Sequence, residues 1–228
     1  MKNLRTSLAL LTILALAVVA VASGALTPKG GNQGSMSGMH MTMSHSSAAS
    51  PKAVQLRIAL NQLLGEHAIL AIQATQRGLV GGKDFNAVAK ALDANSVAIS
   101  KAIGSVYGPA AANQFLNGKN LWRAHIKYFV DYTVALAKKD VAGQKKAVAN
   151  LMTYIQVQAA FFAKATGLPK QALVDDLTAH VLQLKGQLDA YAKGNYNQAY
   201  TLTDGAYNHM FMTGDLLAGA IAKQKGLK

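Results

Sequence analysis

Residues 36–45 hold the densest group of potential metal ligands in the chain. Four of the eight methionines and two of the six histidines lie within this short segment. Thioether sulfur is a soft ligand that selects Cu(I), and imidazole binds Cu(I) or Cu(II). The segment predicts a site for copper or another soft metal, and the alternative is a polar spacer. The candidate ligands of this Met/His-rich segment are Met36, Met39, His40, Met41, Met43 and His45.

The other four histidines lie further along the chain, where apolar residues recur at steps of three and four. Two hypotheses stay open for those at the middle of apolar helical stripes, which are His67, His125 and His180. In the first, each imidazole is buried and neutral and pairs with an asparagine of the returning helix. The candidate partners are Asn95, Asn150 and Asn208. In the second, the three imidazoles converge to bind Zn²⁺ or copper, with His209 and Glu66 as further candidate ligands.

Composition excludes several kinds of chemistry. The chain has no cysteine, which excludes disulfides, thiolate metal sites and a cysteine nucleophile. Its only glutamate is Glu66, whereas a ferritin-like di-iron site needs several glutamates with Glu-x-x-His spacing. The aspartates are expected at helix starts, such as Asp84 and Asp140, and on solvated faces. No catalytic constellation is recognisable, so a non-enzymatic function is the expectation.

The region from Lys52 to Lys228 shows helical periodicity and no alternating stretch typical of a strand. It predicts an all-α, bundle-like domain of about six antiparallel helices, arranged as three helical hairpins. Glycine- or lysine-containing turns separate the helices, and Gly118 is expected to kink the third one. Each hairpin places a histidine 15 to 17 residues before the cap of its second helix, which indicates a threefold internal repeat.

The amino-terminal residues resemble a targeting signal. Lys2 and Arg5 precede an apolar run over residues 8–22, followed by small residues. This pattern predicts a signal peptide over residues 1–25, and an uncleaved membrane anchor is the alternative. Either way the remaining chain is expected outside the cytoplasm, secreted or in the cell envelope. Residues 26–51 are rich in Gly, Ser and Pro and predict a flexible linker that carries the Met/His-rich segment.

A strongly basic balance suggests a second class of partner. The net charge is +13, and it falls to +11 without Lys2 and Arg5. Such a charge favours anionic cell-wall polymers or a membrane surface. The lysines are scattered, and no nucleic-acid-binding module is recognisable. The alternative function is therefore a structural or adhesive envelope protein.

Four segments carry a resemblance to a known group of proteins. They are residues 64–68 (LGEHA), 102–108 (AIGSVYG), 125–132 (HIKYFVDY) and 209–215 (HMFMTGD). Together they resemble a helical domain of secreted Gram-positive proteins, some of which also carry a copper amine oxidase N-terminal-like module. The resemblance spans roughly residues 52–224 and implies an extracytoplasmic helical domain. It implies no oxidase activity, because neither that module nor the catalytic oxidase domain is recognisable in the sequence.

Overall fold

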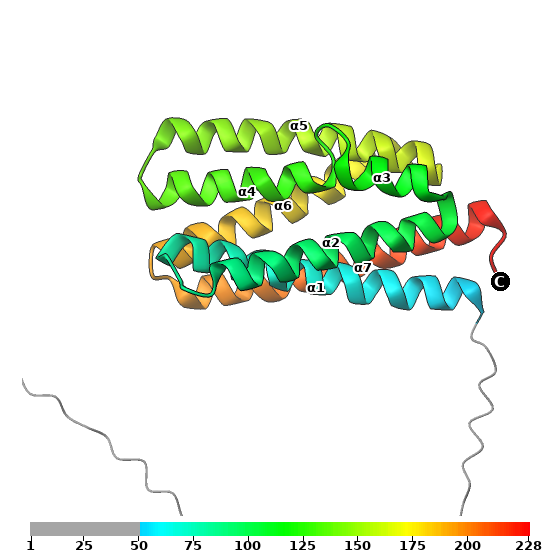
Figure 1. Ribbon diagram of the computed structural model, residues 1–228, viewed down its shortest axis with the longest axis horizontal. Coiled ribbons are helices and arrows are strands. Elements are labelled where there is room, and N and C mark those ends of the chain that lie inside the picture. The colour runs from blue at the N-terminus through cyan, green and yellow to red at the C-terminus, as the bar shows by residue number, and fades with distance from the viewer. Residues whose placement is uncertain (1–50) are drawn as a thin grey trace, which may run out of the picture. The chain divides into compact units, whose positions relative to one another are not determined.

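Helical periodicity and short turns divide residues 51–228, the part of the chain that the computed structural model describes, into seven α-helices (Figure 1). The all-α bundle predicted from the sequence is confirmed. The predicted signal peptide and the Met/His-rich segment lie outside the described residues. Within residues 51–228, no helix is both long and apolar enough to cross a membrane. The helices are α1 (Lys52–Val80), α2 (Phe85–Tyr107), α3 (Pro109–Asn117), α4 (Trp122–Ala137), α5 (Val141–Thr166), α6 (Lys170–Ala192) and α7 (Tyr196–Lys225).

Three antiparallel hairpins build the bundle. α1 packs against α2, α4 against α5, and α6 against α7, as short turns between long helices dictate. α1 also packs along α7, so the first and last hairpins lie together. The first helices of the three hairpins, α1, α4 and α6, run in the same direction (Figure 1). Side chains at matching heights on these three helices can therefore meet in one layer.

The helix ends follow local sequence signals, with one exception. The Asp140 side chain accepts a hydrogen bond from the Gly143 N–H and caps α5, as predicted. Asp84 lies at the start of α2, as predicted, but its side chain makes no capping hydrogen bond. Its carboxylate instead lies 3.1 Å from the Arg77 guanidinium at the end of α1. Gly81 ends α1 with a φ of 65°, a left-handed conformation in which glycine carries no steric penalty.

The third helix expected from the sequence is broken rather than kinked. Gly118 adopts extended backbone and ends α3, and the chain re-enters a helix at Trp122. A Cβ atom at Gly118 would collide with the Leu121 side chain and the Gln114 carbonyl oxygen, so a larger residue does not fit this connection. The break turns α3 into a separate short helix at one end of the bundle.

The two ends of the described chain meet. The Ala53 N–H donates a hydrogen bond of 3.3 Å to the Lys228 carbonyl oxygen. Figure 1 shows the carboxyl end close to the start of α1. The first and last helices are therefore joined at this end of the bundle by backbone as well as by side chains.

Candidate functional site

Three histidines from three different helices meet in the core. His67 on α1, His125 on α4 and His180 on α6 are 0%, 2% and 3% exposed. The ring centroids of His67 and His125 lie 5.4 Å apart, and those of His67 and His180 lie 6.2 Å apart. The Nε2 atoms of His67 and His125 are separated by 3.3 Å. These three residues, named here the histidine group, are brought together because α1, α4 and α6 run in the same direction.

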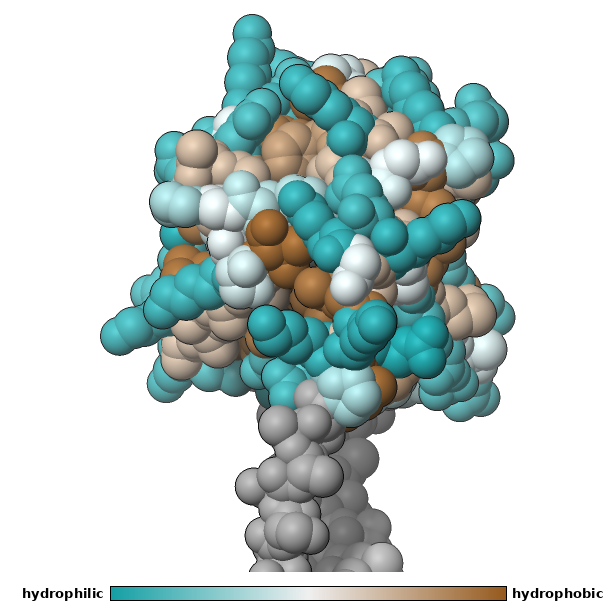
Figure 2. Space-filling model, turned by 90° about the vertical axis from the view of Figure 1, so that its right-hand side faces the viewer, coloured by the Kyte–Doolittle hydropathy of each residue, from teal (hydrophilic) through white to brown (hydrophobic). Residues whose placement is uncertain are grey.

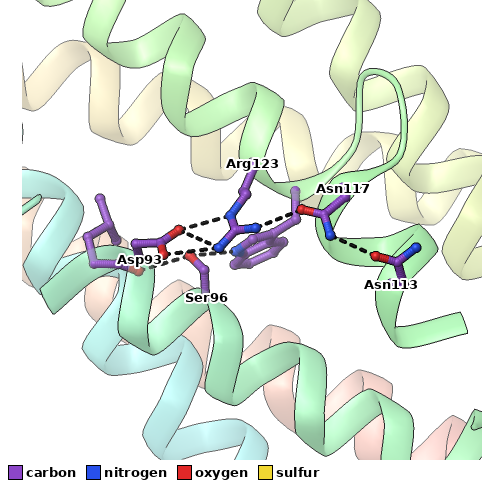
Figure 3. Close-up of polar contacts among 7 residues, drawn as sticks. Asp93, Ser96, Asn113, Asn117 and Arg123 are labelled. Atoms are coloured by element: carbon purple, nitrogen blue, oxygen red, sulfur yellow. Dashed lines mark hydrogen bonds and ion pairs between the residues drawn. The ribbon is translucent and has the colours of Figure 1, made fainter. Parts of the chain in front are cut away.

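The start of α4 is held in place by a polar network on its outer side. Arg123 places two guanidinium nitrogens on the Asp93 carboxylate of α2, at 2.9 and 3.0 Å. Its third nitrogen donates to the Asn117 side-chain oxygen at 2.7 Å, and Asn117 in turn donates to Asn113 (Figure 3). One arginine thus joins α2, α3 and α4 where α4 begins. His125 lies two residues after Arg123 on α4, and its side chain is buried in the core.

Aromatic rings enclose the histidine group. The Trp122 ring centroid lies 4.7 Å from that of His67 and 4.9 Å from that of His125. Its indole N–H donates to the Ser96 hydroxyl of α2 at 3.1 Å, which fixes the orientation of the ring. Tyr154 of α5 stacks on the other side of His125, with centroids 4.5 Å apart. The imidazoles are thus surrounded by apolar surface and shielded from water.

This burial keeps the imidazoles neutral. Desolvation and, to a lesser extent, the charge of a protonated His180 lower the pKa of His125 to about 3, although the Trp122 carbonyl partly opposes them. Desolvation also lowers the pKa of His67 and of His180 well below the ordinary value, and neighbouring histidines add to the effect. Neutral imidazole is the form that binds metal ions. At neutral pH each ring therefore offers a nitrogen lone pair.

The predicted pairing of histidines with asparagines is wrong in residues 51–228. The Asn95 amide donates instead to the Leu63 carbonyl, one turn before His67, at 3.0 Å and to the carboxylate of Glu66, the residue directly before His67, at 2.9 Å. Asn150 is half-buried and Asn208 is exposed, and neither is hydrogen-bonded to an imidazole among the described residues. Glu66 itself is exposed and held by Asn95, so it does not join the histidine group.

The histidine group leaves several nitrogens without hydrogen bonds. The contact between the His67 and His125 Nε2 atoms uses one hydrogen, donated by one ring to the lone pair of the other. The accepting ring must then carry its own hydrogen on Nδ1. The Nδ1 atoms of His67 and His125 have no hydrogen-bond partner among residues 51–228, and neither nitrogen of His180 has one. Buried polar atoms without partners destabilise a fold by about 1–3 kcal/mol each.

The spacing of one pair suits a shared metal ion. Two imidazole nitrogens bound at about 2.0–2.1 Å to one tetrahedral ion lie ~3.3 Å apart. The His67 and His125 Nε2 atoms have this separation as they stand. Across residues 51–228, no three histidine or acidic side chains are already arranged around one point. The described residues therefore provide two imidazole nitrogens at this spacing, and the His180 ring lies 6.2 Å from that of His67.

His209 belongs to a neighbouring polar group rather than to the histidine group. Its Nε2 lies 3.0 Å from the Asp176 carbonyl oxygen and 3.4 Å from the Asp176 carboxylate. Thr213 also donates to that carboxylate, at 3.0 Å. Burial raises the pKa of Asp176, and His209 and Thr213 partly counteract the rise. The His209 ring lies parallel to His180 at 6.3 Å, directed toward α6 and not toward His67.

Sequence reasoning missed the residues that surround the imidazoles. Trp122 is the chain's only tryptophan and lies three residues before His125. Tyr154 and Asp176 were not singled out as neighbours of histidines. The signal in the sequence is the three-residue spacing between Trp122 and His125, because residues three apart lie on the same face of a helix.

Comparison of the chain with protein-family models, with curated proteins and with solved structures finds no match.

Proposed function

We propose that this is an exported, non-enzymatic protein that binds copper or another soft transition metal. The main site is the Met/His-rich segment, and the histidine group provides a second, buried imidazole site. The observation that carries this proposal is the 3.3 Å separation of the His67 and His125 Nε2 atoms, in a pair that burial keeps neutral. The resemblance to secreted helical domains agrees with export.

The two sites would use different ligand chemistry. The thioethers of the Met/His-rich segment carry no proton at any pH of interest and favour Cu(I). The imidazoles of the histidine group suit copper or Zn²⁺, and an ion bound between the Nε2 atoms of His67 and His125 would replace the hydrogen bond between them. His180 is the third ligand in this proposal. The ion would give one of its nitrogens a partner, which both lack among residues 51–228.

A competition assay with a chromophoric Cu(I) chelator tests the first site. In the full chain, replacing Met36, Met39, Met41 and Met43 together by leucine should abolish tight Cu(I) uptake. Leucine keeps the size and hydrophobicity of the side chain and removes the sulfur. The matched control is Met152→Leu with Met212→Leu, two methionines of the bundle surface, and it should leave uptake unchanged. Equal affinity in the wild type and the quadruple variant would refute the site.

Metal-dependent thermal stability tests the second site. His125→Phe keeps an aromatic ring between Trp122 and Tyr154 but removes a ligand. Cu(II) or Zn²⁺ should raise the Tm of the wild-type chain and have little effect on this variant, since ligands that bind only the folded state stabilise it. His209→Phe removes an imidazole outside the histidine group and should keep the metal-induced rise. Loss of the rise in both variants, or in neither, would contradict the assignment.

A second candidate function rests on the surface charge. Among the described lysines, only Lys127 and Lys185 form ion pairs with a carboxylate. The unpaired positive charge supports a structural or adhesive protein that holds anionic cell-wall polymers. This function predicts binding to cell-wall material that weakens as salt is raised and does not respond to chelators. Binding that needs metal and resists salt would favour the first function.

A further inference from the structure

The bundle also contains a cavity, which lies beyond the histidine group at the end of the bundle where α3 packs. It is a cavity of about 380 Å³ between α1, α2, α3, α5 and α7. Figure 2 faces this end and shows hydrophobic side chains at the surface among hydrophilic ones. The volume lies within the range of about 300–1,000 Å³ that is usual for small-molecule sites, which often lie between the helices of bundles.

The wall of the cavity is almost entirely apolar. Its deepest parts are formed by buried side chains of four helices and the start of α4. They include Leu64, Phe115, Trp122, Phe162, Leu217 and Ile221. An apolar cavity of this kind forfeits packing contacts that a closed core would make, and an apolar ligand would restore them. A ligand with a hydrocarbon chain therefore fits the interior.

The mouth of the cavity is polar and positively charged. Lys164 of α5 and Lys225 of α7 line it, together with Gln224 and Tyr107, and no acidic residue does. Neither lysine forms an ion pair with a carboxylate within residues 51–228. The Tyr107 hydroxyl donates to the Ala165 carbonyl at 2.7 Å, and the Lys225 Nζ lies 4.5 Å from the centroid of its ring. Tyr107 thus links α2, α5 and α7 at the mouth and holds one cation there.

We infer that this cavity binds a long-chain carboxylate, a free fatty acid. The hydrocarbon chain occupies the apolar interior toward Trp122, and the carboxylate meets Lys164 and Lys225 at the mouth. Charge complementarity selects this ligand, because a neutral hydrocarbon gains nothing from the two lysines and a cationic amphiphile is repelled by them. The site is independent of the proposed metal sites.

Trp122 provides the measurement. It is the only tryptophan and lines the cavity, so a ligand that enters should change its fluorescence in a saturable way. The probes are dodecanoate, dodecanol and dodecyltrimethylammonium, which share one chain length and differ in charge, titrated into the full chain below their micellar concentrations. Dodecanoate should bind at least ~10-fold more tightly than the other two, which corresponds to about 1.4 kcal/mol. Equal binding of dodecanol would assign the cavity to neutral lipids and overturn the inference, as would an absence of saturable dodecanoate binding.

Charge reversal at the mouth separates a specific site from general adsorption. Lys164→Glu combined with Lys225→Glu should weaken dodecanoate binding by at least ~10-fold, because two attractive charges become repulsive. Lys90→Glu combined with Lys145→Glu changes the net charge equally at exposed positions outside the cavity and should leave binding unchanged. Equal weakening in both double variants, or in neither, would overturn the inference. Ala111→Phe, which places a ring inside the cavity, should reduce dodecanoate binding in calorimetry without lowering helix content.

Discussion

The interior of the bundle contains two neighbouring regions that differ in what they lack. The histidine group is buried, yet four of its six imidazole nitrogens lack hydrogen-bond partners among the described residues. The interior of the cavity has no polar groups that need hydrogen-bond partners, yet a volume of about 380 Å³ is left unfilled. Trp122 belongs to both, because it contacts His67 and His125 and also lines the cavity.

The difference points to two kinds of ligand. Buried donors and acceptors without partners are stabilised by an ion or a polar group, whereas an apolar space is stabilised by hydrocarbon. Leucine at the three histidine positions and larger side chains around the cavity would give a more stable bundle. Departures of this kind from the best-packed solution are expected where a protein functions.

The largest effect should be an acid destabilisation that comes from the histidine region alone. The folded-state pKa of His125 is about 3, and the pKa of His67 and of His180 is also lowered from 6.5. Below about pH 6.5 the unfolded chain binds protons that the folded chain excludes, so stability is complete above that pH and falls toward pH 3. Each histidine contributes a slope of up to ~1.4 kcal/mol per pH unit. Urea unfolding between pH 7 and pH 4 measures the slope.

Replacing His125 by phenylalanine tests whether the pH dependence of stability comes from the histidine group. His125→Phe should reduce it by about 1.4 kcal/mol per pH unit, since one titrating group is removed. His209→Phe is the comparison variant outside the histidine group. A slope that persists unchanged in His125→Phe would show that acid sensitivity lies elsewhere, and the contrast between the two regions would lose its basis.

A smaller effect is expected from Trp122→Phe, which shortens the side chain that separates the histidine group from the cavity. The smaller ring leaves space beside His67 and removes the donor to the Ser96 hydroxyl. We expect a loss of about 1–3 kcal/mol in the free energy of unfolding, from lost packing and one lost hydrogen bond. Thermal or urea unfolding at pH 7 measures it. A change in the free energy of unfolding below ~0.5 kcal/mol, the range of an ordinary surface substitution, would mean that the Trp122 ring contributes little to packing between the two regions.

The smallest effect should follow from Arg123→Ala, which loosens the start of α4 from outside. The side chains of Arg123 and Asp93 are 41% and 56% exposed, so solvent screens their ion pair. A loss of up to about 1 kcal/mol is expected. Lys127→Ala breaks an exposed pair within α4 itself and should cost only ~0.3–0.5 kcal/mol. If the Arg123 variant loses no more than the Lys127 variant, the contacts to α2 and α3 do not help to position the start of α4.

The fold was predictable from local signals, whereas the surroundings of the site were only partly so. Helical periodicity and the turns at Gly81, Gly167 and Gly194 depend on neighbouring residues, and the structure follows them. The convergence of three imidazoles was one of two open hypotheses, and it followed from their equivalent places in three hairpins.

The partner assignment failed for a geometric reason. Counting residues at 1.5 Å rise predicts the height of Asn95 on the returning helix but not the direction in which its side chain leaves the axis. Its amide therefore reaches the Leu63 carbonyl and the Glu66 carboxylate and not the His67 ring. The cavity was not predictable either, because it depends on how far α3 separates from α4 after Gly118.

The contact between Ala53 and Lys228 has a consequence for how the chain can be connected. Because Ala53 and Lys228 already touch, a short Gly-Ser link could join the two ends of residues 52–228 without moving a helix. New ends could then be placed in the exposed turn at Lys138 and Lys139, between the second pair of long helices. Such a circular permutant should keep the same interior, and it would place the start of synthesis at α5 and end it with the helix that carries His125.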